Sequence, residues 1–134
     1  MNEMVLLVDD DVNARIIAET LLRLRDLDVH AATDATDAAA ILDHHRVGVV
    51  VADLSRPDSP GFHVVRHMRT MRPPLGGTRP RLVALTERHE PELERFAARL
   101  GTDALLRKPV HPGELIHTVE RFLHVRNFLI GIPA

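Results

Sequence analysis

The feature that most constrains the fold is an unbroken apolar run that ends in an acid. Residues 48–52 carry no polar side chain, and Asp53 follows directly, ahead of a loop that contains Pro57, Pro60 and Gly61. A strand that is apolar throughout is typical of a parallel sheet that is covered on both faces. In open α/β sheets, ligands bind beyond the carboxyl ends of the strands. Asp53 is therefore a candidate nucleophile or metal ligand, although an acid at this place can also simply cap the next helix.

The rest of the chain alternates apolar runs with helical patterns five times, which predicts repeated β-α units. We expect strands at residues 4–8, 28–32, 48–53, 82–85 and 104–106. We expect the first helix over about residues 12–25, and apolar residues at helical spacing mark the others within 35–42, 64–71, 93–100 and 115–122. Thr33 or Asp34 is available to cap the second helix, and prolines and paired glycines make residues 72–80 a loop. This order predicts one α/β domain with a single, doubly wound, five-stranded parallel sheet.

Composition limits the classes of function. The chain has 134 residues, a net charge of -2 and no cysteine, tryptophan or tyrosine. Direct nucleic-acid binding is not expected, because there is no basic surplus to neutralise phosphates. No apolar run approaches the ~20 residues that span a bilayer, and the chain opens on a strand-like run rather than on a signal peptide. We therefore expect a cytoplasmic protein without membrane insertion.

Polar residues follow four of the expected strands at their carboxyl ends. They are Asp9, Asp10 and Asp11 after the first strand, Asp53 after the third, Thr86 after the fourth and Lys108 after the fifth. Right-handed crossovers bring neighbouring strand ends to one edge of the sheet. Clustered carboxylates repel one another unless a cation intervenes, and an oxygen-only ligand set selects a hard ion such as Mg2+. With a lysine and a threonine facing that ion, the pattern favours a site that stabilises a transferring phosphoryl group, with a carboxylate as its acceptor.

These motifs resemble the receiver domain of two-component response regulators. The resemblance rests on the acids at 9–11, the spacing Asp53-x-x-x-Pro57-x-x-x-Gly61, the pair 85–86 and the pair 108–109. It covers residues 4–125 and implies the flavodoxin-like fold with strand order 2-1-3-4-5. Residues 126–134 would then extend the last helix as far as a cap at Gly131, or form an apolar tail that packs on a partner.

The resemblance implies a signalling switch that is phosphorylated on Asp53. The phosphoryl group would come from a phosphohistidine on a sensor histidine kinase or on a histidine phosphotransfer protein. Asp10 and Asp53 would bind Mg2+ directly, Asp9 would bind it mainly through water, and Ser55 would contribute its backbone carbonyl. Such a domain is not an enzyme in the usual sense, although it would catalyse its own phosphorylation and dephosphorylation.

The resemblance also implies how the signal leaves the site. Lys108 would pair with Asp53 and then with the phosphate, and the Lys108–Pro109 peptide would be cis. Thr86 would move inward to bind the phosphoryl group, which rearranges the face made by helix four, strand five and helix five. That face would act on a downstream output domain or target protein. We leave open whether this is a stand-alone receiver or the N-terminal part of a longer protein.

The sequence departs from the family pattern on this output face and beside the site. Leu105 stands where the family usually has the switching Tyr or Phe, and Glu87 stands where a small residue usually follows the threonine. Ala104 replaces a common Asp, and Thr118 occupies a common arginine position. The salt-bridged dimer of many DNA-binding regulators is therefore not expected, which leaves at most a weak homodimer.

Two other functions compete with this interpretation. One is a receiver-like scaffold that is not phosphorylated, which the unusual Glu87 and Leu105 would favour. The other is a phosphatase of the haloacid dehalogenase type, because Asp9-x-Asp11 fits its motif, but that class leaves the Asp53 spacing unexplained. His63 and His67 are four residues apart on a predicted helix and could clip a metal, although no third ligand is evident and a solvated face is favoured. Arg88 is expected to face solvent at the mouth of the site and to influence its kinetics.

Overall fold

The sheet has five parallel strands in the order β2-β1-β3-β4-β5, as the resemblance implied. The computed structural model describes residues 3–71 and 79–129, with the backbone alone for 125–129. The strands are β1 (Met4–Val8), β2 (Val29–Ala32), β3 (Val47–Asp53), β4 (Arg81–Thr86) and β5 (Ala104–Arg107). The helices are α1 (Val12–Arg23), α2 (Ala35–His44), α3 (Pro60–Thr70), α4 (Glu92–Arg99) and α5 (Pro112–Leu129). The predicted single, doubly wound α/β domain with a flavodoxin-like receiver fold is thus confirmed.

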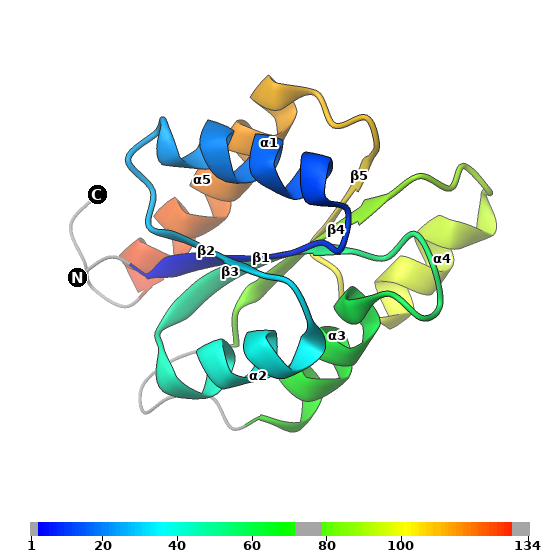
Figure 1. Ribbon diagram of the computed structural model, residues 1–134, viewed down its shortest axis with the longest axis horizontal. Coiled ribbons are helices and arrows are strands. Elements are labelled where there is room, and N and C mark those ends of the chain that lie inside the picture. The colour runs from blue at the N-terminus through cyan, green and yellow to red at the C-terminus, as the bar shows by residue number, and fades with distance from the viewer. Residues whose placement is uncertain (1–2, 72–78, 130–134) are drawn as a thin grey trace.

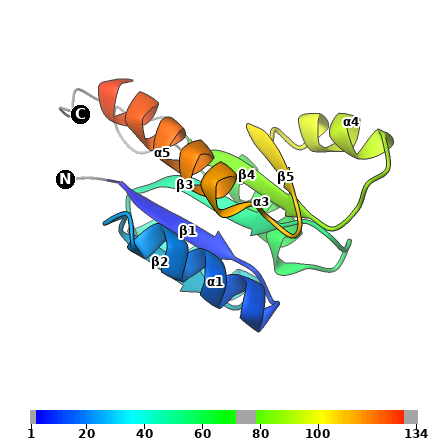
Figure 2. The same ribbon diagram turned by 90° about the horizontal axis from the view of Figure 1, so that it is seen from above.

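Helices cover both faces of the sheet, which explains why its central strands carry no polar side chain. The helices α1 and α5 lie on one face and α2 and α3 on the other, while α4 lies beside β5 at the edge (Figures 1 and 2). Along β1, Leu6 and Val8 pack in the core under α2 and α3, whereas Val5 and Leu7 pack in the core under α1 and α5. Successive side chains of a strand point to opposite faces, so a strand with two covered faces must be apolar at every position.

Most predicted boundaries agree with the structure to within two residues. The predicted first helix is too long, because α1 ends at Arg23 and Asp26 adopts a left-handed backbone with φ of 58°. Of the two predicted caps of α2, Thr33 and Asp34, the cap is Asp34, whose side chain accepts a hydrogen bond from the N–H of Asp37 at 2.8 Å. Most of the predicted loop at 72–80 lies outside the described residues.

The last helix continues past the predicted domain end at residue 125. It runs through 18 residues to Leu129, in line with the extension that was one of two alternatives for the tail. The expected cap at Gly131 lies outside the described residues. None of the helices in the described part of the chain is long and apolar enough to cross a membrane.

Candidate functional site

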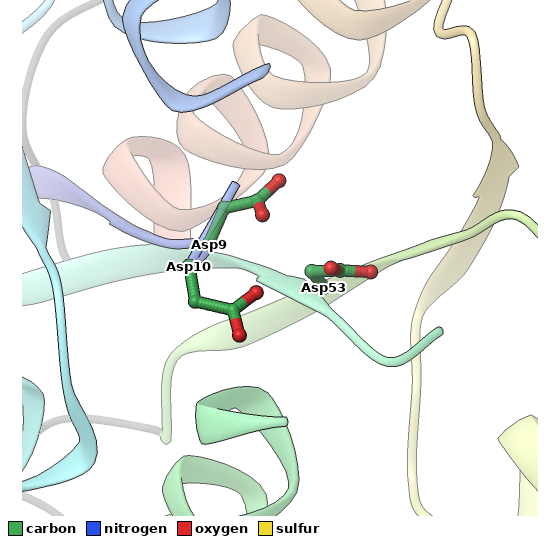
Figure 3. Close-up of side chains that lie close together, drawn as sticks. All are labelled: Asp9, Asp10 and Asp53. Carbon is green, nitrogen blue, oxygen red and sulfur yellow. The ribbon is translucent and has the colours of Figure 1, made fainter. Parts of the chain in front are cut away.

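Three carboxylates meet at the carboxyl ends of β1 and β3. Val8 and Ala52 are register partners in these neighbouring strands, so the acids that follow them, Asp9 and Asp53, emerge side by side. Together with Asp10 they bring one carboxylate oxygen each to within 4.8 Å of one another (Figure 3). Asp9 is 1% exposed and Asp53 is 4% exposed, whereas the side chain of Asp10 is 35% exposed. The strand register therefore assembles an acidic cluster with two buried members and one at the surface.

Asp11 does not belong to this cluster, although the sequence places it in the same acidic run. Its side chain accepts a hydrogen bond from the N–H of Ala14 at 3.2 Å and so caps the N-terminus of α1. An aspartate at this position satisfies one of the unpaired N–H groups of the first helical turn. Asp9 and Asp10 of the acidic run thus belong to the site, whereas Asp11 caps a helix.

Lys108 brings a cation into the cluster from the loop after β5. Its Nζ lies 2.7 Å from Oδ2 of Asp9 and 3.4 Å from Oδ2 of Asp53, and its side chain is only 10% exposed. The backbone N–H of Lys108 donates to the carbonyl of Thr86 at 2.7 Å, and the following peptide to Pro109 is cis as expected. The expected pair with Asp53 is present, but the shorter contact is with Asp9.

Burial and charge act in opposite directions on these groups. Burial raises the pKa of Asp9 above its ordinary value, and the hydrogen bond from Lys108 offsets only part of that rise. For Lys108, burial alone would lower the pKa, but the hydrogen bond to Asp9 and the negative charges of Asp53 and Asp9 raise it. The lysine is therefore charged at neutral pH and neutralises part of the cluster.

Ser55 donates hydrogen bonds to Asp53, and the hydroxyls of Ser55 and Thr86 both accept N–H groups of the loop after β4. The N–H of Ser55 donates to Oδ1 of Asp53 at 3.0 Å, and its hydroxyl donates to the same oxygen. The same hydroxyl accepts the N–H of Glu87 at 3.1 Å, so Ser55 connects Asp53 to the loop after β4. Thr86 is fully buried, and its hydroxyl accepts the N–H of Arg88 at 3.0 Å. The sequence singled out Ser55 for its carbonyl, and the role of its hydroxyl appears only in the structure.

The spacing from Asp53 to Gly61 has a steric explanation. A Cβ at Gly61 would lie 2.3 Å from the carbonyl oxygen of Asp53, which is closer than any real Cβ contact. The buried hydroxyl of Ser59 donates to that same carbonyl at 2.9 Å. Glycine and serine thus let the start of α3 pack directly against the residue that ends β3, which fixes the backbone of Asp53.

Arg56 was not singled out from the sequence, yet its guanidinium contacts the cluster. Its Nη2 forms a hydrogen-bonded ion pair with Oδ2 of Asp10, and its Nε lies 3.4 Å from Oδ1 of Asp58. The hydrogen bond to Asp10, with the charge of that carboxylate, raises the pKa of Arg56. The spacing Asp53-x-x-x-Pro57 leaves this position open, so only its place in the loop three residues after Asp53 could have drawn attention to it.

A hollow of about 410 Å3 lies beside the site. Its walls include Lys108 and Glu87 together with apolar side chains of α1 such as Ile17. Glu87 is exposed and borders this hollow. Arg88 is exposed, as expected, and pairs with Glu90, its Nε lying 3.2 Å from Oε2 of that residue.

The acidic cluster suits a hard divalent cation. Among the described residues, Asp9, Asp10 and Asp53 are the one group of acids and histidines whose geometry could hold a metal. All three offer carboxylate oxygen, and two of them are buried at a place where uncompensated negative charge is costly, so the donor set fits Mg2+. The histidine pair on α3 does not form a metal clip, since Nε2 of His67 lies 2.8 Å from Oδ1 of Asp43 on α2.

Comparison with known proteins agrees with this geometry. The family model of the response regulator receiver domain matches residues 5–120. An uncharacterised 14.6 kDa protein of Leptolyngbya boryana is 32% identical over 118 residues, which cover 88% of each chain. The transcriptional regulatory protein GltR of Pseudomonas aeruginosa is 27% identical over 92% of this chain, which spans only 50% of GltR. The solved structure of the chemotaxis response regulator CheY4 of Vibrio cholerae is similar with a TM-score of 0.72 and 26% identity, over 91% of this chain and 99% of the other.

Proposed function

The chain belongs to the response regulator receiver domain family, and from that premise we propose that it is a phosphorylation-dependent switch of a two-component system. Asp53 accepts the phosphoryl group from a phosphohistidine of a sensor histidine kinase or a histidine phosphotransfer protein in the cytoplasm. Membership of this family excludes the haloacid dehalogenase alternative. The observation that carries the proposal is the buried carboxylate of Asp53, which lies within reach of a lysine ammonium and of two further acids.

The residues around Asp53 have separate tasks in this transfer. An Asp53 carboxylate oxygen forms a bond to phosphorus while the bond from phosphorus to the histidine nitrogen breaks, and the proton needed by the leaving imidazole comes from the kinase side or from water. Asp9, Asp10, Asp53 and the carbonyl of Ser55 would hold Mg2+, which supplies positive charge against the phosphoryl oxygens when it is bound. Lys108 supplies a second positive charge, and Thr86 supplies a hydroxyl.

The signal leaves through the face made by α4, β5 and α5. The new phosphoryl group adds about 1.5–2 negative charges to the site, enough to bias an element that has two arrangements. Thr86 is the last residue of β4, and its carbonyl accepts the N–H of Lys108, so movement there reaches the end of β5 directly. Leu105 packs against the core between α3 and the sheet, where a leucine offers no aromatic ring to reorient. A downstream output domain or target protein would read this face.

The test is phosphorylation by a small donor. The purified chain is incubated with acetyl phosphate, with and without Mg2+, and its intact mass is measured. We expect a gain of one phosphoryl group only when Mg2+ is present, and no gain in Asp53→Asn. An unmodified protein under all conditions would instead support the scaffold function, and modification of Asp53→Asn would show that another residue is the acceptor.

A further inference from the structure

The loop after β3 places a positively charged side chain on the exposed member of the acidic cluster. Arg56 is three residues beyond Asp53, and its guanidinium pairs with Oδ2 of Asp10. The arginine side chain is 56% exposed, whereas that of Asp10 is 35% exposed. The pair is thus partly open to water, and it engages the carboxylate of a residue that belongs to the candidate metal site.

Each acid of the cluster has a cationic neighbour. Lys108 forms ion pairs with Asp9 and Asp53, and Arg56 forms one with Asp10. The two cations are not equivalent, because Lys108 is 10% exposed and pairs with buried carboxylates. An exposed ion pair is worth little, whereas breaking a buried one is expensive. Arg56 is therefore the cation that can leave when a divalent ion binds.

A second carboxylate, outside the cluster, lies close enough to pair with the guanidinium of Arg56 once it leaves Asp10. Nε of Arg56 already lies 3.4 Å from Oδ1 of Asp58, an acid whose side chain is 85% exposed and lies outside the cluster. A short rotation toward Asp58 would free Asp10 without leaving the arginine in need of a new partner. The guanidinium can therefore pair either with Asp10 in the site or with Asp58 beside it.

We propose that Arg56 is a built-in competitor for Mg2+, whose guanidinium holds Asp10 and must leave it before the divalent ion can bind. Arg56 is then a positioning residue that sets the Mg2+ concentration at which the switch can be phosphorylated. This inference rests on the proposed function and adds a regulator to it. Coupling of this kind is reciprocal, so bound Mg2+ weakens the pair between Arg56 and Asp10 by the same factor.

The size of the effect follows from the exposure of the pair. Exposed ion pairs of this kind reduce the population of the free carboxylate by a few fold, and a nearby positive charge adds screened repulsion of the incoming ion. We expect removal of the charge to tighten Mg2+ binding roughly threefold to tenfold.

The experiment is a titration with MgCl2 at constant ionic strength, followed by the amide resonances of residues 9–11 and 53–56. The chain has no tryptophan or tyrosine, so these resonances replace intrinsic fluorescence as the measure of binding. The variants are Arg56→Gln, which removes the charge, and Arg56→Lys, which keeps it. Arg25→Gln is the matched control. Arg25 is 55% exposed and pairs with Glu120, which is 36% exposed, and this pair joins the turn after α1 to α5, away from the acids.

We expect Arg56→Gln to bind Mg2+ threefold to tenfold more tightly than wild type, with Arg56→Lys and Arg25→Gln within about twofold of it. The Mg2+ concentration for half-maximal phosphorylation by acetyl phosphate should fall by the same factor. Unchanged binding in Arg56→Gln, weaker binding, or equal tightening in Arg25→Gln would each overturn the inference. If wild type does not bind Mg2+ at all, the proposed function itself fails, so the two failures can be distinguished.

Discussion

Replacing Lys108 by methionine should destabilise the protein in the absence of Mg2+ because it leaves two buried carboxylates without their shared cation. The lysine nitrogen lies 2.7 Å from Asp9 and 3.4 Å from Asp53, and these acids are 1% and 4% exposed. Methionine keeps most of the length and apolar volume of the side chain, so the change removes mainly the charge. The variant therefore isolates the electrostatic role of Lys108 from its packing.

The expected loss of unfolding free energy at pH 7 is about 3 kcal/mol. Removing one partner of a buried ion pair costs about 3–5 kcal/mol, and the neighbouring exposed carboxylate of Asp10 favours the low end because water can reach the site. With an m-value of about 2 kcal/mol per M of urea, this loss lowers the urea midpoint by roughly 1.5 M. Mg2+ at ten times its dissociation constant would restore about 1.4 kcal/mol.

The pH dependence has a definite sign. Burial already raises the pKa of Asp9, and the hydrogen bond from Lys108 that opposes this rise is lost in the variant. A carboxyl group whose pKa is higher in the folded protein takes up a proton on folding, so its contribution to stability is greatest below the unfolded pKa. That contribution is lost as the pH rises through the folded pKa. The stability difference between wild type and Lys108→Met should therefore shrink as the pH is lowered from 7 toward 4.5.

Urea unfolding followed by far-UV circular dichroism measures these differences. The control is Asp9→Asn in the Lys108→Met background, which removes one of the unpaired charges and should recover about 1–2 kcal/mol. Equal urea midpoints for wild type and Lys108→Met at pH 7 without Mg2+ would refute the reasoning. A difference that grows on acidification would refute it as well.

Three further predictions concern the surroundings of the site. Glu87→Ala should be phosphorylated by acetyl phosphate up to about threefold faster than wild type at low salt and no faster at high salt, because the exposed charge of Glu87 lies beside the site and repels the anionic donor. Glu90→Ala is the control. Equal rates for Glu87→Ala and wild type at low salt would show that Glu87 does not hinder the donor. Gly61→Ala should lose about 1–3 kcal/mol of stability, because its Cβ would meet the carbonyl of Asp53 at 2.3 Å, whereas Gly113→Ala meets only a side chain at 3.3 Å. A urea midpoint like that of wild type for Gly61→Ala would contradict this. Because Leu105 replaces an aromatic switch, amide shift changes on phosphorylation should concentrate at residues 86–88, and large changes across 104–122 would argue against a weakened switch.

The pattern of apolar runs and strand-end acids was enough to predict a doubly wound parallel sheet and the edge at which the candidate site lies. Strands that are apolar at every position can be satisfied only between two layers of helices, and alternation with helical patterns leaves a parallel sheet as the consistent arrangement. Since the carboxyl ends of parallel strands share one edge, Asp9 and Asp53 had to meet there. The sequence also showed the spacing from Asp53 to Gly61, but the steric reason for glycine at that position was seen only in the structure.

Which charges pair within the site could be seen only in the folded structure. Lys108 lies nearer to Asp9 than to Asp53, Asp11 caps α1 instead of joining the cluster, and Arg56 folds back onto Asp10. The spacing of apolar residues in the sequence predicts which helix or strand a residue belongs to and which end of it the residue is near, but not which side chains it contacts. Ion pairs and caps depend on shorter distances, which are set by loop paths and by the packing of elements that are distant in the sequence, so the choice among nearby partners is made only when the chain folds.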